Sequence, residues 1–543
     1  MKTSKQVLNE SSFILIASAA FVKIISAIFK IPLASEFALG NVGFGYFSVA
    51  HDIFTPFFVL AISGLPAAIS HITAEFIANA KYSSIKDSYK TIKKLFSIIG
   101  AIAGGIVAII VLLIFILSKY KFYNFYSILA VTPAIFLSFI MSIYRGFFEG
   151  HKNMRPTAIS KIIQAIFKSV LSLALAILVI KTTNNYALAA AAATLAISIG
   201  SLISTLYLKY KFKNNSPLKD YKCQSESIEP TSLKSILILA LPFAFASLAS
   251  SLIALVDAIT VNFSITNASQ GYIDIVKNLY LPKNLINKAN FDITAYLYGI
   301  RSKAFTIYDL IPTITMSVGL GALPTLTQSK AVNDDKSVIS NTNYVLKLIT
   351  TLTFPAAIGL IALGGPIMNL LYSSNDTLSA NVLMIYGLAA LFAGFSVPVT
   401  SVLQSLNCQY DALKHVIIGL FIKVVTNLIF IKFAFINVSA AALGTLCCYF
   451  YIAVSFIILL FKSTKIDVKN IFIKPLISAI VCGLSAHLVS LISSGKLFTL
   501  LSIAVAFIVY LVFILLTKTY THSELINFPI INRFLSNKNT TNA

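Results

Sequence analysis

The segment YRGFFEGHKNMRPTAISKIIQ, residues 144–164, holds two arginines and two lysines and joins two long apolar runs. Apolar runs of about 20 residues are long enough to cross the hydrocarbon core of a bilayer as helices. Pro156 suits the first turn of the second helix, where its missing backbone N–H breaks no hydrogen bond. The segment therefore predicts a helical hairpin, with residues 149–156 as a short basic loop at one membrane surface.

The composition of the whole chain agrees with this interpretation. Of its 543 residues, 57% are hydrophobic and 11% are charged, and the mean hydropathy is +0.85. A soluble domain has about 25% charged residues. Backbone polar groups cannot stay unpaired in hydrocarbon, so such long runs should be helices, and a barrel would show shorter alternating segments. We expect an all-α polytopic membrane protein.

Fourteen apolar runs are long enough to be transmembrane helices. The first has no small-residue cleavage site after it and is interpreted as an uncleaved helix. The predicted spans are 11–33, 44–70, 93–118, 122–148, 157–180, 186–208, 235–261, 302–326, 343–372, 379–406, 412–433, 437–461, 470–493 and 497–517.

The formal net charge of +23 is concentrated between the runs, which favours membrane topology over nucleic-acid binding. With a cytoplasmic N-terminus, the loops after the second, sixth and twelfth runs are inside and rich in lysine, and both termini are cytoplasmic. The loops after the first and ninth runs are then outside and carry no Lys or Arg. The outside segment 262–301 is basic, but long segments obey the rule poorly. Binding of anionic lipid headgroups is a compatible second role for the basic loops.

The two halves of the chain show an internal repeat. Pro56 matches Pro312 and Lys168 matches Lys423, at offsets of 256 and 255 residues. Both copies start inside, as in parallel transporter repeats that enclose a central site. We expect an N-terminal lobe of six helices at 1–210, a cytoplasmic linker at 211–234, a C-terminal lobe at 235–465, two added helices at 466–520 and a cytoplasmic tail at 521–543. Glycines and prolines such as Gly64 and Pro66 are plausible bending points of these helices.

Three blocks carry a resemblance to a known family: GLPAAISHITAEF (64–76), RGFFEGHKNMRPTA (145–158) and LYGIRSKAFTIYDLIPTITMSVGLGALPTLTQS (297–329). The chain resembles the stage V sporulation protein B family of polysaccharide-type exporters, a branch of the MOP exporter superfamily related to MurJ-type lipid II flippases. The resemblance implies a V-shaped pair of six-helix lobes in a bacterial plasma membrane.

The resemblance also implies a function. Such a protein flips undecaprenyl-pyrophosphate-linked saccharide, with lipid II as the first expectation, from the inner to the outer leaflet. Its partners would be this lipid-linked anionic glycan, membrane lipids and cell-wall synthases. Export of another lipid-linked polysaccharide unit and MATE-like cation or drug antiport remain alternatives. The deep charges of the chain lean basic, which favours an anionic substrate.

Basic residues inside the predicted helices are candidates for a substrate cavity, because a lysine at a helix centre costs at least about 2.5–3.5 kcal/mol. An ammonium group there is a suitable partner for pyrophosphate. The resemblance implies cavity arginines on the first, second and eighth helices, as in the Gram-negative lipid II flippases. Here the first helix has Lys23 and Lys30 at similar places, Arg301 lies at the outer start of the eighth, and the second helix has Phe57 and Phe58 but no arginine. The alternatives are structural ion pairing, for example of Lys23 with Asp52, and snorkelling of Lys30. The predicted cavity residues are Lys23, Lys30, Lys168, Lys423 and Arg301.

Two further groups of charged residues have predicted roles. Arg145, Arg155 and Glu75 lie near the inner surface as a possible cytoplasmic gate, or in the case of the arginines as topological and headgroup contacts. The intramembrane acids Asp52, Asp257 and Asp309 are possible sites of ion coupling. For Asp52 and Asp309, pairing with Lys23 or Lys303 is the alternative. His51, beside Asp52, could titrate near neutral pH, but a lone histidine is more often a hydrogen-bonded helix residue, and we favour that interpretation.

Enzymatic chemistry is not indicated. There is no G-x-x-x-x-G-K-[ST] sequence for ATP, and no nucleophile, base and orienting residue can be identified together. The five cysteines form no metal or disulfide pattern. We therefore expect a transporter without a cofactor, driven by a Na⁺ or H⁺ gradient or by the membrane potential.

Overall fold

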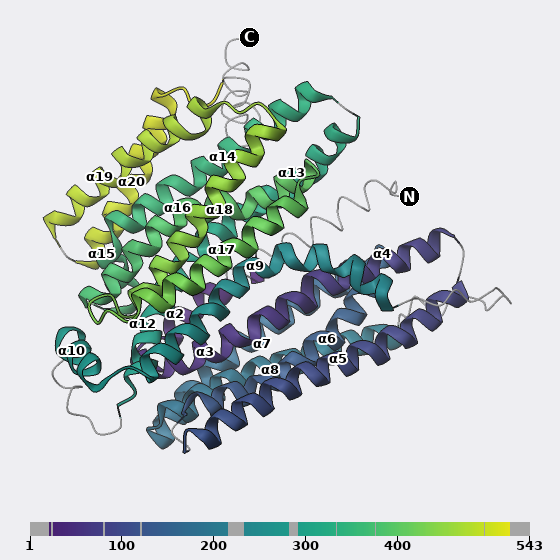
Figure 1. Cartoon of the computed structure of the whole chain (residues 1–543), viewed down its shortest axis with the longest axis horizontal. Helices are drawn as coiled ribbons and strands as arrows, with labels where there is room; N and C mark the ends of the chain where they lie inside the picture. The colour runs from purple at the N-terminus through teal and green to yellow at the C-terminus, as the bar shows by residue number, and fades with distance from the viewer. Residues whose placement is uncertain are drawn as a thin grey trace, which may run out of the picture. The chain divides into compact units, whose positions relative to one another are not determined.

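A computed structural model describes residues 21–22, 25–79, 82–119, 122–214, 233–281, 291–332, 334–374, 376–493 and 495–521. All regular secondary structure in these ranges is helical (Figure 1). From the N-terminus to the middle of the chain, the helices are α2 (Lys30–Leu33), α3 (Gly40–Val59), the π-helical turn η1 (Leu60–Gly64), α4 (Leu65–Ala78), α5 (Tyr82–Leu117), α6 (Asn124–Gly150), α7 (Arg155–Thr183), α8 (Tyr186–Asn214), α9 (Leu233–Thr266) and α10 (Gln270–Tyr280).

The second half of the chain continues in the same way. Its helices are α12 (Ile293–Tyr308), α13 (Leu310–Ala331), α14 (Asp335–Ala362), α15 (Gly364–Tyr372), α16 (Thr377–Ser405), α17 (Gln409–Phe430), α18 (Ser439–Ser463), the π-helical turn η2 (Lys469–Ile473), α19 (Lys474–Ile492) and α20 (Lys496–Leu516).

Twelve helical segments in the described ranges are long and apolar enough to cross a membrane. A thirteenth results if α9 and α10 count as one span, although they meet at an angle of 109°. The prediction of an all-α polytopic membrane protein is confirmed. Most of the first predicted run, 11–33, lies outside the described residues, so the total of fourteen helices and the two-lobe arrangement stay predictions.

At least three predicted runs have different boundaries in the structure. The run 302–326 lies within a longer span, Ile293–Ala331, which is made of α12 and α13. The run 44–70 is part of a longer span from Gly40 to Ala78, and this span contains η1 next to Gly64 and Pro66. Because Pro66 has no N–H to donate, a local widening of the helix is expected there. The run 343–372 is two helices, α14 and α15, which are separated where two glycines and Pro366 weaken helix formation.

The described residues form two compact units. The first holds the chain up to Thr306 together with Leu420–Gly444, and the second holds Ile307–Gly419 and the chain from Thr445 onward. The boundary falls within α12, α17 and α18. The lobe boundaries predicted from the repeat are a different division of the chain and stay a prediction.

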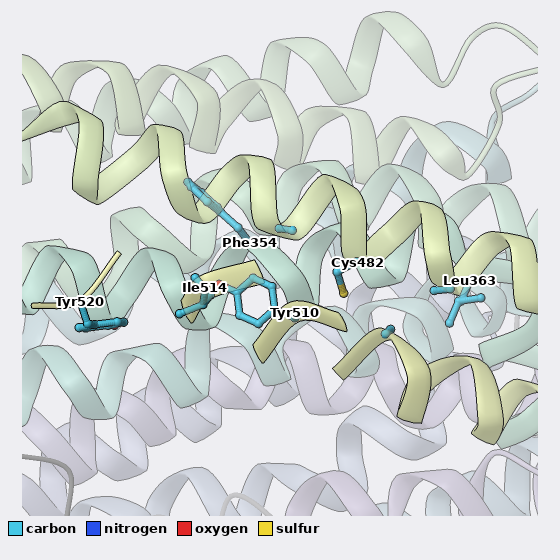
Figure 2. Close-up of a cluster of buried hydrophobic side chains, with 9 residues drawn as sticks. Phe354, Leu363, Cys482, Tyr510, Ile514 and Tyr520 are labelled. Atoms are coloured by element: carbon cyan, nitrogen blue, oxygen red, sulfur yellow. The ribbon is translucent and has the colours of Figure 1, made fainter. Parts of the chain in front are cut away.

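The second unit has an apolar core where α14, α19 and α20 meet (Figure 2). Phe354 and Leu363 pack there with Cys482 and with Tyr510 of α20. The Tyr510 hydroxyl also donates to the Thr351 carbonyl oxygen at 2.8 Å. This core joins the last two transmembrane helices to the rest of their unit.

In the first unit, α3 and α12 approach each other at two glycines. A Cβ atom added at Gly45 would lie 1.9 Å from the Ala295 carbonyl oxygen, and one added at Gly299 would lie 1.9 Å from the Asn41 carbonyl oxygen. Small residues allow such backbone contact between helices. The reciprocal contact fixes the register of α12 on α3, and this register positions the site described below.

We expect Gly45→Ala to lower the melting temperature of the purified protein by several degrees, because the new methyl group must displace backbone atoms. Gly105→Ala is the matched control, since a Cβ atom there meets nothing within 4 Å. Alanine is the better helix former, so the control should melt at or above the wild-type temperature. Equal melting of the two variants would contradict the close packing of α3 on α12.

Candidate functional site

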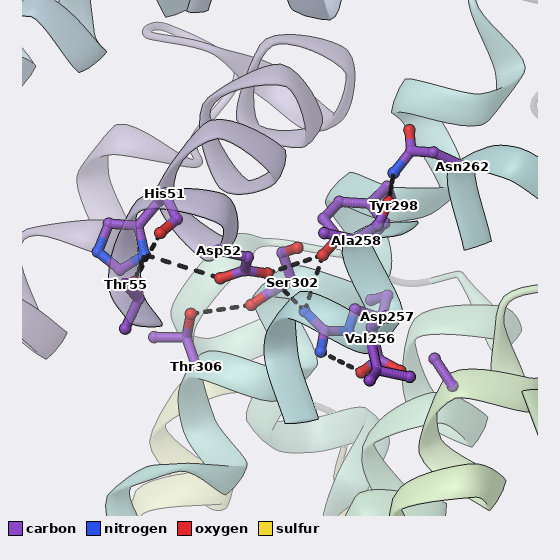
Figure 3. Close-up of polar contacts among 12 residues, drawn as sticks. His51, Asp52, Thr55, Val256, Asp257, Ala258, Asn262, Tyr298, Ser302 and Thr306 are labelled. Atoms are coloured by element: carbon purple, nitrogen blue, oxygen red, sulfur yellow. Dashed lines mark hydrogen bonds and ion pairs between the residues drawn. The ribbon is translucent and has the colours of Figure 1, made fainter. Parts of the chain in front are cut away.

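Arg301 of α12 is the centre of a buried ion-pair cluster in the first unit. Its Nη1 atom lies 3.0 Å from Asp52 Oδ2 on α3, and its Nη2 atom contacts Asp257 Oδ2 on α9. Tyr298, one helical turn before Arg301, donates its hydroxyl to the same Asp52 oxygen at 2.7 Å. The guanidinium also lies over the ring of Phe305, with 4.2 Å between Cζ and the ring centroid. Figure 3 shows Asp52 between His51 on one side and Tyr298 on the other.

Lys423 of α17 completes the cluster from the other side of Asp257. Its ammonium nitrogen lies 2.7 Å from Asp257 Oδ1 and donates to the Ala441 carbonyl oxygen at 3.2 Å. Asn427, one turn further along α17, donates to Asp257 Oδ1 at 2.8 Å and to Thr260 Oγ1 at 2.9 Å. Both oxygens of Asp257 are therefore occupied by charge-assisted hydrogen bonds.

The cluster holds two carboxylates and two cations, so its formal charge is zero. Arg301, Asp257 and Lys423 have no exposed surface, and Asp52 is 6% exposed. Charges taken out of water are tolerated when each has a close partner of opposite sign and its remaining donors are hydrogen bonded. The contacts of these four residues meet that condition.

A group of basic residues adjoins this neutral cluster, and we call Lys30, His51 and Lys168 the cationic group. The Lys168 ammonium lies 3.3 Å from Ser26 Oγ and 5.4 Å from the centre of the Phe29 ring. The Phe29 ring packs edge-on against Phe47, and Phe47 stacks on the His51 ring, so a row of aromatic contacts connects Lys168 to His51. All three side chains are partly exposed, in contrast to Arg301 and Lys423.

The predicted cavity residues divide between these two groups. Lys168 contacts the Phe29 ring, next to Lys30 in the sequence, whereas Arg301 and Lys423 are taken up by the buried ion pairs. Lys23 lies outside the described residues. Contact of any of these residues with a substrate stays a prediction.

The three predicted ion-coupling acids do not all lie together. Asp52 and Asp257 are brought together by Arg301, a partner of Asp52 that the sequence did not indicate. Asp309 lies just before α13 in the second unit and is exposed. Ion coupling through any of them stays a prediction.

Three neutral members of the site were missed by sequence reasoning: Tyr298, Asn427 and Thr260. None carries charge, so the cost of burying a charge did not reveal them. Their helical spacing was a usable signal. Each follows or precedes a charged member by three or four residues, which places both on one helix face.

The predicted gate residues do not form one group. Arg145 has no exposed surface, while Arg155 and Glu75 are exposed. Arg145 donates from Nε to Ser160 Oγ at 3.0 Å and from Nη2 to Gln164 Oε1 at 3.3 Å. Gln164 in turn donates to Ser201 Oγ at 3.0 Å. Arg145 thus connects α6 to α7 and, through Gln164, to α8, and a gating role stays a prediction.

Replacing Asp257 by Asn should strongly destabilise the protein, because Arg301 and Lys423 would keep buried charges with one carboxylate fewer. Breaking a buried pair in this way costs about 3–5 kcal/mol. The double variant Asp257→Asn, Lys423→Met restores a formally neutral cluster and should recover part of the loss in thermal unfolding. Asp87→Asn, which removes an exposed carboxylate 3.7 Å from Lys90, is the matched control and should change little. A double variant less stable than Asp257→Asn would argue against charge balance as the cause.

Arg145→Met should destabilise the purified protein by about 1–3 kcal/mol, because Ser160 and Gln164 lose a buried charged donor. Arg155→Met changes the same residue type at an exposed position and should leave the unfolding transition nearly unchanged. Chemical or thermal unfolding in detergent measures both. Equal effects of the two substitutions would show that Arg145 does not stabilise the helix bundle.

Comparison with known proteins places the chain in a family. A family model described as "Polysaccharide biosynthesis protein" matches residues 8–289, just over half of the sequence. The chain belongs to the polysaccharide biosynthesis protein family. A second model, "Lipid II flippase MurJ", matches residues 304–525 of this member of the family. The resemblance inferred from the three sequence blocks is confirmed.

Two curated relatives from Bacillus subtilis (strain 168) cover most of this polysaccharide biosynthesis protein. Lipid II flippase MurJ is 26% identical, over 78% of this chain and 77% of its own length. Stage V sporulation protein B is 23% identical, over 98% of this chain and 99% of its own.

Solved structures show the fold. A lipid II flippase MurJ in an inward closed conformation aligns with a TM-score of 0.66 at 16% identity, covering 93% of this chain and 99% of that one. An inward-facing MATE family multidrug transporter of the MOP superfamily aligns with a TM-score of 0.56 at 14% identity, covering 80% and 96%. The chain therefore has a MurJ-like fold, which is shared with MATE transporters.

Proposed function

We propose that the protein is a flippase that moves an undecaprenyl-pyrophosphate-linked saccharide from the inner to the outer leaflet, with lipid II as the first candidate. The observation that carries this proposal is the cationic group beside a charge-neutral cluster, in a chain whose relative over 78% of its length is a lipid II flippase. The family accounts for a glycan substrate, and the charge of the group accounts for an anionic headgroup.

The physical argument compares cations that are fully buried in ion pairs with cations that are partly exposed. Arg301 and Lys423 are neutralised by Asp52 and Asp257, so they add little to the field felt by a substrate. Lys30 lies on α2 and Lys168 on α7, and these two helices contact each other. A pyrophosphate bound at this contact would have two ammonium groups as partners. An ammonium in a partly desolvated site attracts phosphate more strongly than it does in water.

A second candidate is export of another undecaprenyl-linked glycan. The relative that covers 98% of this chain is stage V sporulation protein B, and its name specifies no lipid. Drug antiport is disfavoured, because a cationic drug would need an available carboxylate. Asp257, the most buried acid of the site, has a cation on each of its oxygens.

The remaining parts of the proposal follow from the transport reaction. We propose a bacterial plasma membrane location with cytoplasmic termini, alternating access as the transport mechanism, and a Na⁺ or H⁺ gradient or the membrane potential as the driving force. Cell-wall synthases that consume the translocated lipid are proposed partners.

The proposal is tested by rescue of bacterial cells whose own lipid II flippase can be switched off. Wild type should restore lipid II on the outer leaflet, whereas Lys168→Gln, at matched membrane levels, should reduce its exposure at least several-fold because one phosphate-facing cation is lost. Lys181→Gln is the matched control, since Lys181 is an exposed lysine in the last turn of the same helix. Lys23→Ala tests the further predicted cavity residue.

The outcomes separate the candidates. Rescue by wild type and Lys181→Gln but not by Lys168→Gln supports lipid II as substrate and the cationic group as its contact. A well-expressed wild type that restores no exposure excludes lipid II and moves the second candidate forward. Full rescue by Lys168→Gln would remove this lysine from substrate recognition.

A further inference from the structure

The short helix α10 lies beyond the end of α9 and turns away from its direction (Figure 1). The two helices meet at an angle of 109°. α9 has 34 residues, whereas about 20 are enough to cross the hydrocarbon core, so α10 is not needed to complete that span. Membrane-spanning helices are tilted by about 20° on average. A helix nearly at right angles to α9 therefore runs close to the plane of the membrane surface.

The exposed surface of α10 is divided into a polar and an apolar strip. Gln270, Asp274 and Asn278 recur every four residues and are exposed, and Gln270 donates to Asp274 Oδ1 at 3.2 Å. Ile275 and Leu279, also four residues apart, are 43% and 48% exposed. Residues four apart lie on one face of a helix, and consecutive residues are rotated by about 100°. The polar strip and the apolar strip therefore run side by side along α10.

The third side of α10 is held by the protein. Val276 has no exposed surface, and the Tyr280 hydroxyl donates to the Phe435 carbonyl oxygen at 2.9 Å. Phe435 belongs to the turn between α17 and α18 and is itself 73% exposed. At the other end of α10, Ser269 caps the helix by accepting a hydrogen bond from the Tyr272 backbone N–H at 3.3 Å. These contacts fix the rotation of α10, and with it the directions in which the two strips face.

A membrane surface is the environment that fits two such strips. An amphipathic helix that lies in the interface plane has its apolar face buried about 5–10 Å into the boundary between headgroups and acyl chains, while its polar face stays in water. The transmembrane helix α9 leads directly into α10, so this part of the chain emerges where lipid is already present. Contact with acyl chains removes the apolar strip from water, which is favourable.

We propose that α10 is an interfacial helix of the outer leaflet, with Ile275 and Leu279 inserted below the phospholipid headgroups and the polar strip facing water. The choice of leaflet rests on the proposed topology, in which the segment 262–301 is outside. The interfacial position itself is independent of the transported substrate. An anchored α10 holds the outer end of α9, the helix that carries Asp257, at a constant depth in the bilayer.

The absence of tryptophan from the chain allows a direct test, because one introduced tryptophan is then the only indole that fluoresces. The full-length protein is reconstituted in phosphatidylcholine vesicles that contain lipids brominated either near the headgroup end or near the terminal end of the acyl chain. Ile275→Trp and Leu279→Trp should lose about half of their emission with the shallow bromines and less with the deep ones, as expected for burial of about 5–10 Å. Both positions are exposed on the protein, and either variant suffices if the other fails to fold.

Matched controls come from the same helix and from a transmembrane helix. Asp274→Trp and Asn278→Trp, one residue before each apolar position, should be quenched by aqueous iodide and little by either brominated lipid. Phe507→Trp replaces an exposed ring on the transmembrane helix α20 and should be protected from iodide and quenched by brominated lipid.

The leaflet is tested with vesicles in which protease cleavage of a C-terminal tag reports the orientation of the protein. Iodide on the side opposite to the tag should quench Asn278→Trp. Quenching from the same side as the tag would overturn the assignment to the outer leaflet.

Three results would overturn the interfacial position. Iodide quenching of Ile275→Trp and Leu279→Trp would show that the apolar strip faces water. Protection of both from iodide and from bromine would show that a protein surface covers them. Equal quenching of all four α10 variants by deep bromines would place the helix inside the hydrocarbon. None of these measurements uses lipid II, so a failure of the flippase proposal in the rescue assay and a failure of this inference are separate results.

Discussion

The two bonds of Arg301, one to Asp52 and one to Asp257, are the interaction on which the first unit depends. They join helices α12, α3 and α9, which are up to 249 residues apart in sequence. A guanidinium without exposed surface has no water to replace a lost carboxylate. The helices therefore have to keep the register that brings both acids to Arg301. The close backbone packing at Gly45 and Gly299 favours the same register, so steric and electrostatic constraints agree.

The balance of charge within this cluster also matters for the stability of the first unit. If Asp52 and Asp257 were absent, Arg301 and Lys423 would keep buried charges without a carboxylate to balance them, which is strongly unfavourable. Lys30 and Lys168 are partly exposed, whereas Arg301 and Lys423 have no exposed surface. The buried ion pairs therefore hold two of the five predicted cavity residues inside the protein.

The sequence predicted the membrane fold from its long apolar runs. It predicted the charged members of the site because a charge inside such a helix has a large cost, and the cost marks the residue. The sequence could not assign the partner of each charged residue. Arg301 binds Asp52, whereas Lys23 and Lys303 were the partners that the sequence indicated. Arg145 was expected near the inner surface, yet it is fully buried and bound to Ser160 and Gln164. Such pairings depend on how helices rotate against each other, and this rotation is not encoded in the spacing of apolar residues along one helix.

The repeat-related lysines show how equivalent positions acquire different chemistry. Lys168 and Lys423 match in the two copies of the sequence, but Lys423 is fully buried against Asp257 while Lys168 contacts Ser26 and the face of Phe29. A hydroxyl and an aromatic ring stabilise an ammonium without cancelling its charge. Two lysines at corresponding positions of the sequence therefore have different surroundings, because the residues that face them on neighbouring helices are not repeated.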